Sequence, residues 1–188
     1  PNLTWEKAQD YKLSLDFGMF GDRLSGIVEG YMRHSTDVVV SSKIPSTTGY
    51  TYQKFNSADI LNKGIEFTLN GKILDIRDFR MNASFNLSYN INKVLKYDSP
   101  DKLTASTRYW EGYPTDALFI GKLDGLNHEG LYQYKLRPDA SISDVKDYQV
   151  ADNYRYHLGT TAAPFTVGFN LSIPWKGLSL SCFGALSW

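Results

Sequence analysis

Residues 62–93 alternate between apolar and polar side chains, with one interruption near position 76. A period of two, kept over about ten residues on each side of the interruption, predicts two antiparallel β-strands joined by a short turn at residues 74–79. The apolar face carries Ile65, Phe67, Leu69, Gly71 and Ile73, and then Met81, Ala83, Phe85, Leu87, Tyr89 and Ile91. The polar face of the second strand is uncharged, with Asn82, Ser84, Asn86, Ser88, Asn90 and Asn92.

The length of these two segments indicates where such a hairpin would lie. Ordinary strands average about five or six residues, whereas strands that span a bilayer need about nine to eleven. The hairpin therefore has the length of a transmembrane β-hairpin. The same alternation recurs in two further pairs of segments, although Ile27 and Tyr31 interrupt the polar face of one segment. The additional pairs of predicted strands are residues 11–19 with 24–33, and residues 167–175 with 178–187.

The connections between the six predicted strands alternate between short and long. Turns near Gly21, residues 74–79 and Lys176 contain a few residues, whereas the links at residues 34–61 and 94–164 contain tens. Outer-membrane barrels show this alternation because their short turns lie in the periplasm and their long loops lie outside the cell. An open sheet of six strands would leave two unpaired edges in hydrocarbon. We therefore predict an all-β, antiparallel transmembrane β-barrel segment, about six strands of a larger barrel.

The second long link contains two weaker structural signals. Residues 119–126 have the composition of a short strand and a turn. Residues 141–148 are predicted to form one or two helical turns, because Ser141 and Asp144 resemble a capping pair. The remainder of the link shows little sustained periodicity, so we predict a long extracellular loop.

Composition argues against some function classes, but it does not distinguish a soluble domain from a barrel segment. The 188 residues contain 20 Lys and Arg against 20 Asp and Glu, with a mean hydropathy of −0.35, and these values fit a soluble domain or a barrel segment. No basic stripe is present, which argues against nucleic-acid binding. No apolar run reaches the roughly 18 to 20 residues of a transmembrane helix, so any membrane crossing must use strands. A soluble all-β carbohydrate-binding or adhesion domain and a passive pore stay open as alternatives.

The sequence contains no recognisable catalytic or metal-binding constellation. His34, His128 and His157 are far apart and have no metal-ligand spacing, and the single Cys182 has no partner for a disulfide or a zinc site. Residues 124–130 are rich in oxygen donors but lack the alternating acidic positions of an EF-hand loop. We therefore expect no enzymatic activity, no cofactor and no metal site.

Aromatic residues of the predicted extracellular loops are the candidate contacts for a ligand or a partner. Binding residues concentrate on loops that a rigid scaffold positions, and aromatic rings can stack on sugars. The simpler interpretation is that these rings hold the long loops together or form a protein interface, and we favour it. The candidates are Tyr50, Tyr52, Tyr109, Trp110 and Tyr113.

Several short motifs, taken jointly and in order along nearly the whole chain, carry a family resemblance. The chain resembles the late barrel strands of the SusC/RagA-type TonB-linked (TonB-dependent) outer-membrane transporters. It departs from the family pattern at residues 166–168, where a second Gly beside Gly168 is expected, and at Trp175, where Tyr is usual. The motifs stand at residues 1–6, 15–18, 22–26, 45–49, 62–66, 112–114 and 121–126, at Gly159 with residues 164–165, and at residues 175–178.

This resemblance implies a function and a set of partners. It implies a barrel of twenty-two strands with an N-terminal plug, located in the bacterial outer membrane and energised by the TonB complex. It also implies import of oligosaccharides or peptides together with a SusD-like surface lipoprotein, in contact with outer-membrane lipid. We expect residues 1–188 to be part of the barrel domain, with no plug domain in this chain.

Overall fold

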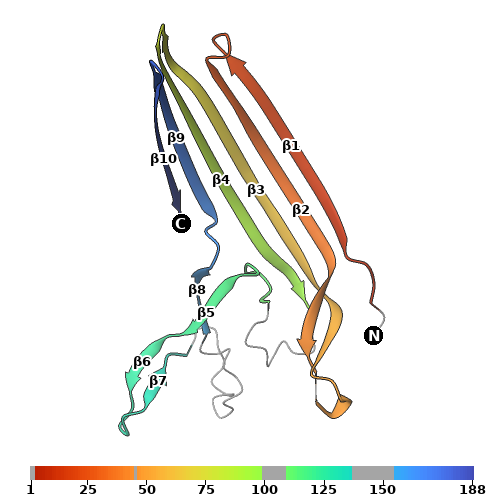
Figure 1. The fold of residues 1–188 in the computed structure, drawn as a ribbon. Coiled ribbons are helices and arrows are strands. Elements are labelled where there is room, and N and C mark those ends of the chain that lie inside the picture. The colour runs from red at the N-terminus through yellow and green to blue at the C-terminus, as the bar shows by residue number, and fades with distance from the viewer. Residues whose placement is uncertain (1–2, 45, 99–108, 137–154) are drawn as a thin grey trace.

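The structure is a computed structural model that describes residues 3–44, 46–98, 109–136 and 155–188. Six long strands form one antiparallel sheet in the order β1-β2-β3-β4-β9-β10 (Figure 1). This confirms the predicted all-β, antiparallel fold. No helix within the described residues is long and apolar enough to cross a membrane. The strands are β1 (Lys7–Met19), β2 (Leu24–Lys43), β3 (Tyr52–Ile76), β4 (Phe79–Tyr97), β9 (Phe165–Trp175) and β10 (Leu178–Ser187).

All three short turns lie at the same end of the sheet (Figure 1). They follow β1 at residues 20–23, β3 at residues 77–78 and β9 at residues 176–177. Lys176 and Gly177 both have positive φ, 46° and 85°, the conformation of a tight hairpin turn whose twist matches its strands. The longer connections therefore all lie at the opposite end, as the alternation of connector lengths predicts.

The first long connection is shorter than the sequence suggests, so the predicted connector at residues 34–61 is wrong. Strands β2 and β3 continue through most of that range, and the loop itself comprises residues 44–51 with the short 3-10 helix η1 (Ser46–Thr48). The two strands form a ribbon that extends past the neighbouring strands (Figure 1). The alternation of apolar and polar residues does not reveal this ribbon in the sequence, because the pairing register shifts between Ser35 and Val38 and again between Val38 and Val39.

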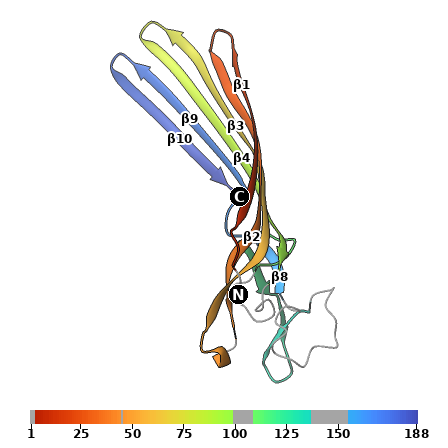
Figure 2. The ribbon, with the colours of Figure 1, turned by 90° about the vertical axis from the view of Figure 1, so that its right-hand side faces the viewer.

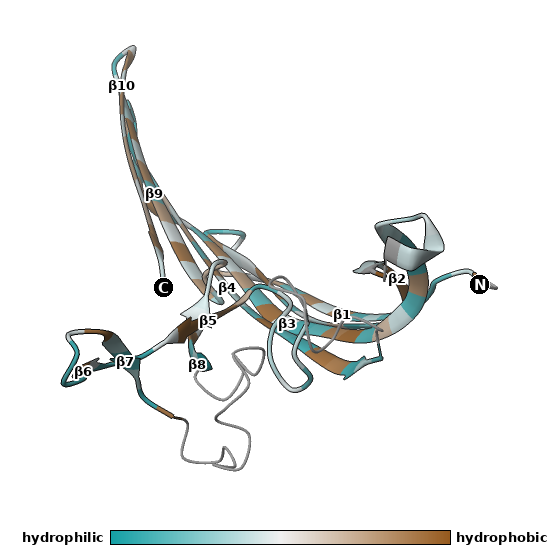
Figure 3. Ribbon diagram, turned by 90° about the horizontal axis from the view of Figure 1, so that it is seen from below, coloured by the Kyte–Doolittle hydropathy of each residue, from teal (hydrophilic) through white to brown (hydrophobic). Residues whose placement is uncertain are grey.

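The strand register carries the apolar and polar faces across the whole sheet. Leu69 is paired with Phe85, and Phe85 with Phe169, so apolar residues of three strands, which belong to two hairpins, form one row. One residue further along, the polar residues Asn70, Ser84 and Asn170 form the next row on the other face. The alternation of hydropathy along each ribbon is visible in Figure 3.

The sheet is a single curved layer (Figures 2 and 3). Its apolar face is open, since Leu13, Phe169 and Leu180 are 79%, 50% and 67% exposed. A soluble sandwich buries such a face against a second sheet about 10 Å away. The described residues provide no such layer, so the apolar face has the character of a surface that contacts lipid.

The small buried core lies at the loop end of the sheet, beyond the regular strand pairs. Val94, Ala58 and Tyr97 are 0%, 2% and 4% exposed. Val38, Val40, Ile60 and Tyr109 pack against them. The core thus joins the outer parts of β2, β3 and β4 to the long loop.

The described part of the insertion between β4 and β9, residues 109–136 and 155–164, contains four short strands at the loop end (Figure 1). They are β5 (Ala117–Gly121), which pairs with β8 (Arg155–Thr160), and β6 (Leu123–Leu126), which pairs with β7 (Tyr132–Tyr134). Residues 119–126, predicted as one strand and a turn, thus belong to two strands in separate sheets. The helical turns predicted at residues 141–148 lie outside the described residues.

Candidate ligand and partner surface

The segment at residues 109–116 is hydrogen-bonded along the outer end of β4. The backbone N–H of Val94 donates to the carbonyl of Tyr113, and that of Gly112 donates to the carbonyl of Val94, each at 2.8 Å. The side chain of Asn92 accepts a bond from the N–H of Thr115 at 2.6 Å. These bonds hold three of the candidate aromatic residues over the end of the strand.

Trp110 and Tyr113 belong to an aromatic cluster within the long loop. The Trp110 ring stacks on Phe119 of β5, with centroids 4.5 Å apart. Tyr113 contacts Phe119 edge-on at 5.1 Å and His157 of β8 at 4.9 Å. Tyr109 lies apart from this cluster, against Tyr97 of the small core at 5.7 Å. Their rings therefore face other parts of this chain.

Phe119 and His157 complete the cluster but were absent from the candidates chosen from sequence. Phe119 lies in a weakly periodic stretch, and His157 is separated from it by the rest of the insertion. Only the pairing of β5 with β8 brings the two rings to 5.5 Å. No local pattern could have identified this contact.

Tyr50 and Tyr52 lie in a different place, at the tip of the β2–β3 ribbon. Their side chains are 72% and 63% exposed. The tip is closed by a bond from the N–H of Ile44 to the carbonyl of Thr51 at 3.1 Å. Of the five candidates, these two present the most open aromatic surface to a ligand or a partner.

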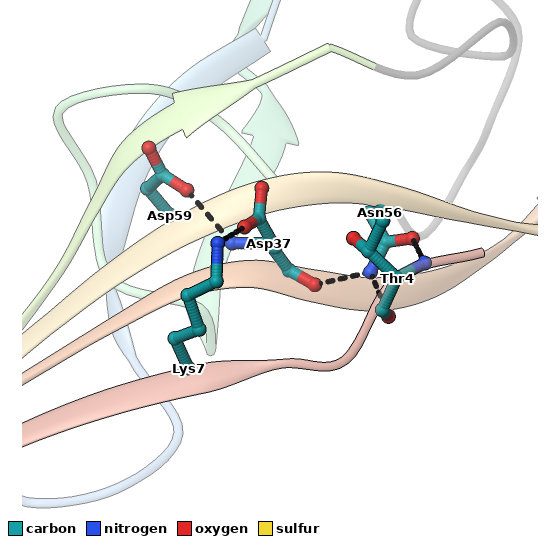
Figure 4. A network of polar contacts seen from close by, with 5 residues as sticks. All are labelled: Thr4, Lys7, Asp37, Asn56 and Asp59. Carbon is teal, nitrogen blue, oxygen red and sulfur yellow. Dashed lines mark hydrogen bonds and ion pairs between the residues drawn. The ribbon is translucent and has the colours of Figure 1, made fainter. Parts of the chain in front are cut away.

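A polar network anchors the base of this ribbon (Figure 4). The Asn56 side chain exchanges two hydrogen bonds with the backbone of Thr4, at 2.8 and 2.9 Å, and donates a third to the carbonyl of Asp37 at 2.6 Å. Lys7 forms an ion pair with Asp37 at 3.1 Å, and Asp59 accepts a bond from the Asp37 N–H at 3.2 Å. These contacts connect Asp37, which lies within the register shift of β2, to β3 and to the residues around the start of β1.

The polar face of the sheet contains a recess of about 260 Å³ near the short turns. Amide and hydroxyl groups dominate its wall, with a few charged side chains at the turn end. It offers many hydrogen-bonding groups without a strong net charge. The lining residues are Asp22, Arg23, Ser25, Asn70, Gly71, Lys72, Asn82, Ala83, Ser84, Asn170 and Ser172.

In the oxygen-rich turn at residues 127–130, one side-chain oxygen is already engaged in hydrogen bonds. The Asn127 side-chain oxygen accepts bonds from the N–H groups of Glu129 and Leu131, at 2.9 and 2.8 Å. Across the described residues, no group of three or more His, Cys, Asp or Glu side chains is arranged to hold a metal ion.

Comparison with known proteins gives a consistent result. Residues 1–184 match the family described as TonB dependent receptor-like, beta-barrel. The chain is 27% identical to the TonB-dependent receptor P3 of Formosa agariphila over 97% of its length and 20% of that relative. It is 36% identical to the TonB-dependent receptor SusC of Bacteroides thetaiotaomicron over 53% of its length and 10% of that relative. The chain thus spans a fifth or less of the length of these relatives.

Solved structures superpose on nearly the whole chain. The RagAB peptide transporter superposes with a TM-score of 0.77 and 26% identity, covering 96% of this chain and 21% of that one. The outer membrane transporter YddB of Escherichia coli superposes with a TM-score of 0.54, covering 98% of this chain and 21% of that one. At 13% identity, the second likeness concerns the fold alone.

Proposed function

Because this chain belongs to the family of TonB-dependent receptor-like β-barrels, we propose that it forms wall and extracellular loops of an importer of oligosaccharides or peptides. Proteins of this family are barrels of the bacterial outer membrane, and the chain is located there. The importer would act with a SusD-like surface lipoprotein. Energy would come from the TonB complex, acting on parts of the intact barrel other than these strands.

The two-faced sheet is the observation that carries this proposal. One face is a continuous set of apolar rows that includes Leu69, Phe85 and Phe169, and the other is a set of Asn and Ser rows. A wall between lipid and a wet lumen needs this alternation on every strand. The unpaired outer edges of β1 and β10 would each need a further strand in hydrocarbon. A soluble carbohydrate-binding or adhesion domain would instead cover its apolar face.

The chemistry of the polar face supports an uncharged cargo. Asn70, Ser84 and Asn170 offer donors and acceptors in a row beside the recess on that face. Amide and hydroxyl groups exchange hydrogen bonds with sugar hydroxyls or peptide groups without selecting a charge. The similar structure named the RagAB peptide transporter is in keeping with a peptide cargo.

For the lipoprotein contact we propose Tyr50 and Tyr52. Exposed aromatic rings are enriched at protein interfaces, where a rigid ring buries much surface at a small entropy cost. Both residues lie at the tip of the β2–β3 ribbon, and this ribbon extends beyond the neighbouring strands of the sheet (Figure 1). Trp110 and Tyr113, whose rings contact Phe119, would shape the loop and touch the cargo only through their outer edges.

Uptake by intact cells tests the function. In a strain that lacks the receptor, labelled oligosaccharide or peptide mixtures should enter only after the full-length gene is restored, and an uncoupler should abolish entry. Entry that persists with the uncoupler indicates a passive pore instead. Release of the protein from membranes by alkaline carbonate, without detergent, would contradict the barrel assignment altogether.

Co-purification tests the partner surface. The double variant Tyr50→Ala/Tyr52→Ala should assemble in the outer membrane but lose its associated lipoprotein. Tyr132→Ala is the matched control, because Tyr132 is 72% exposed on the separate β6–β7 hairpin. Equal lipoprotein recovery from the double variant and the wild type would exclude the ribbon tip as the contact.

A further inference from the structure

Lys63 and Lys93 stand on the mainly apolar face, toward its loop end, where the strand register also places Lys7, Gln9 and His34. Lys63 of β3 is paired with Ile91, and Lys93 of β4 is paired with Leu61. The lysines are therefore diagonal neighbours on one face of one strand pair. Diagonal side chains on a sheet have Cβ atoms about 7–8 Å apart or less, within reach of two long side chains that share one target.

Aromatic residues mark both limits of the apolar band on this face. Toward the turns, Phe79 is paired with Trp175; toward the loops, Tyr89 is paired with Phe165, whose ring centroid lies 4.4 Å from that of Trp188. The two rows are about ten residues apart, or about 34 Å along a strand. At a strand tilt of about 45° this is about 24 Å in height, matching the roughly 25 Å band between the aromatic girdles of outer-membrane barrels.

The two lysines lie just beyond the outer aromatic row. Ile65 is paired with Tyr89, so Lys63 lies about 7 Å further along β3 than that row, and Lys93 lies about 14 Å beyond Tyr89 along β4. After correction for strand tilt, both Cα atoms are at the depth of lipid headgroups. Lysine stems lie along apolar surface while the ammonium reaches the polar layer.

No carboxylate of the described residues neutralises the charges of these two lysines. Among the described residues, neither Lys63 nor Lys93 has an ion-pair partner, and both side chains are exposed. Glu66 lies on the polar face, and Asp59 accepts a bond from the backbone of Asp37. Three other basic residues toward this end form ion pairs: Lys7 with Asp37, Lys12 with Glu29 and Arg33 with Asp10.

We propose that Lys63 and Lys93 bind the phosphate of an anionic lipid headgroup in the outer leaflet. Two ammonium groups on the lipid side of the wall, at headgroup depth and without a carboxylate partner, have the charge and placement that such a phosphate complements. Acyl chains of the same lipid would lie along the apolar rows below, over Ile65 and Phe67. The inference rests on the proposed function only in requiring that the sheet span the membrane.

Native mass spectrometry of the intact barrel measures the bound lipid. The probes are diphosphorylated lipid A and the same lipid after enzymatic dephosphorylation, each added to barrels in mild detergent. Each lysine should contribute about fivefold to the preference for the phosphorylated probe, so Lys63→Gln/Lys93→Gln should lower it about thirtyfold. High salt should weaken the wild-type preference and leave that of the double variant nearly unchanged.

The matched control removes two lysines from the polar face. Lys12→Gln/Lys72→Gln makes the same change in net charge, and the heat-modifiable migration of each variant verifies folding. This control should keep the wild-type preference. An unchanged preference in Lys63→Gln/Lys93→Gln, or an equal loss in the control, would overturn the proposal. A barrel that alkaline carbonate extracts would instead contradict the membrane placement, which separates the two failures.

Discussion

The Tyr31 hydroxyl donates a 2.9 Å hydrogen bond to the side-chain oxygen of Asn90, although a whole strand separates the two residues. Gly64 lies between them, paired with Tyr31 on one side and with Asn90 on the other. With no side chain at Gly64, the tyrosine ring can lie flat across β3. Tyr31, which interrupts the polar pattern of its strand, therefore links three strands on the polar face.

Adding a methyl group at Gly64 should disrupt this link. A Cβ there would be 2.6 Å from the Tyr31 hydroxyl oxygen and 2.5 Å from the carbonyl oxygen of Tyr89. We expect Gly64→Ala to destabilise the barrel by about 1–3 kcal/mol, because the backbone carbonyl cannot move aside. Urea unfolding, followed by heat-modifiable migration, measures the loss.

Gly30→Ala is the control for this prediction. A Cβ at Gly30 would have no atom within 4 Å, so the change should stay within about 0.5 kcal/mol. If both variants lose the same stability, the effect comes from glycine replacement in strands generally, and the crossing of Tyr31 over Gly64 has no special role.

Adjacent positions on β4 allow a direct test of which face meets lipid. Phe85 lies in an apolar row with Leu69 and Phe169, whereas Ser84 lies in a polar row with Asn70. Phe85→Arg should cost about 2–4 kcal/mol, since an arginine near the bilayer midplane must leave water, while Ser84→Arg should cost about 1 kcal/mol or less. Refolding yields in lipid vesicles over a urea series give both values, and equal costs would contradict the assignment of the faces.

The regular hairpins could be predicted from sequence, because each of their strands carries apolar side chains on one face and mainly polar side chains on the other. The alternation from Ile65 to Gly71 survives in the structure. The turn predicted at residues 74–79 is shorter, at residues 77–78, because pairing resumes at Leu74 after a register shift that follows Lys72. The same reasoning failed for residues 34–61. At Asp37 the backbone adopts φ 58°, the pairing slips, and the following Val38, Val39 and Val40 no longer alternate.

The surroundings of the candidate aromatic residues could not be predicted from sequence, for a different reason. Tyr109 packs on Tyr97 and Trp110 stacks on Phe119, contacts made by distant segments that fold back over the end of β4. Their burial depends on tertiary packing, which no local period encodes. Tyr50, at the ribbon tip, stays exposed because neighbouring strands end before it.

The anchor of the ribbon should depend mainly on Asn56. Its side chain makes three hydrogen bonds, to Thr4 and to the carbonyl of Asp37, so Asn56→Ala should free the segment before β1. Each bond contributes about 0.5–1.5 kcal/mol, and amide hydrogen exchange at Thr4 should accelerate by about tenfold or more.

Lys7→Ala serves as the comparison, because its ion pair with Asp37 joins side chains that are 72% and 42% exposed. Exposed pairs contribute about 0–1 kcal/mol, so exchange at Thr4 should change little. A larger effect from Lys7→Ala than from Asn56→Ala would mean that the charge pair, and not the amide, holds the base of the ribbon.

Trp110→Ala separates a structural role of the loop aromatics from a role in binding. The Trp110 ring covers Phe119, so its removal should destabilise the loop by about 1–2 kcal/mol and speed amide exchange at Gly112 about five- to thirtyfold. Tyr50→Ala, which removes an exposed ring, should leave that exchange unchanged. If Trp110→Ala instead abolishes uptake while exchange at Gly112 stays at the wild-type rate, the indole contacts cargo directly, and the stacking on Phe119 positions it for that contact.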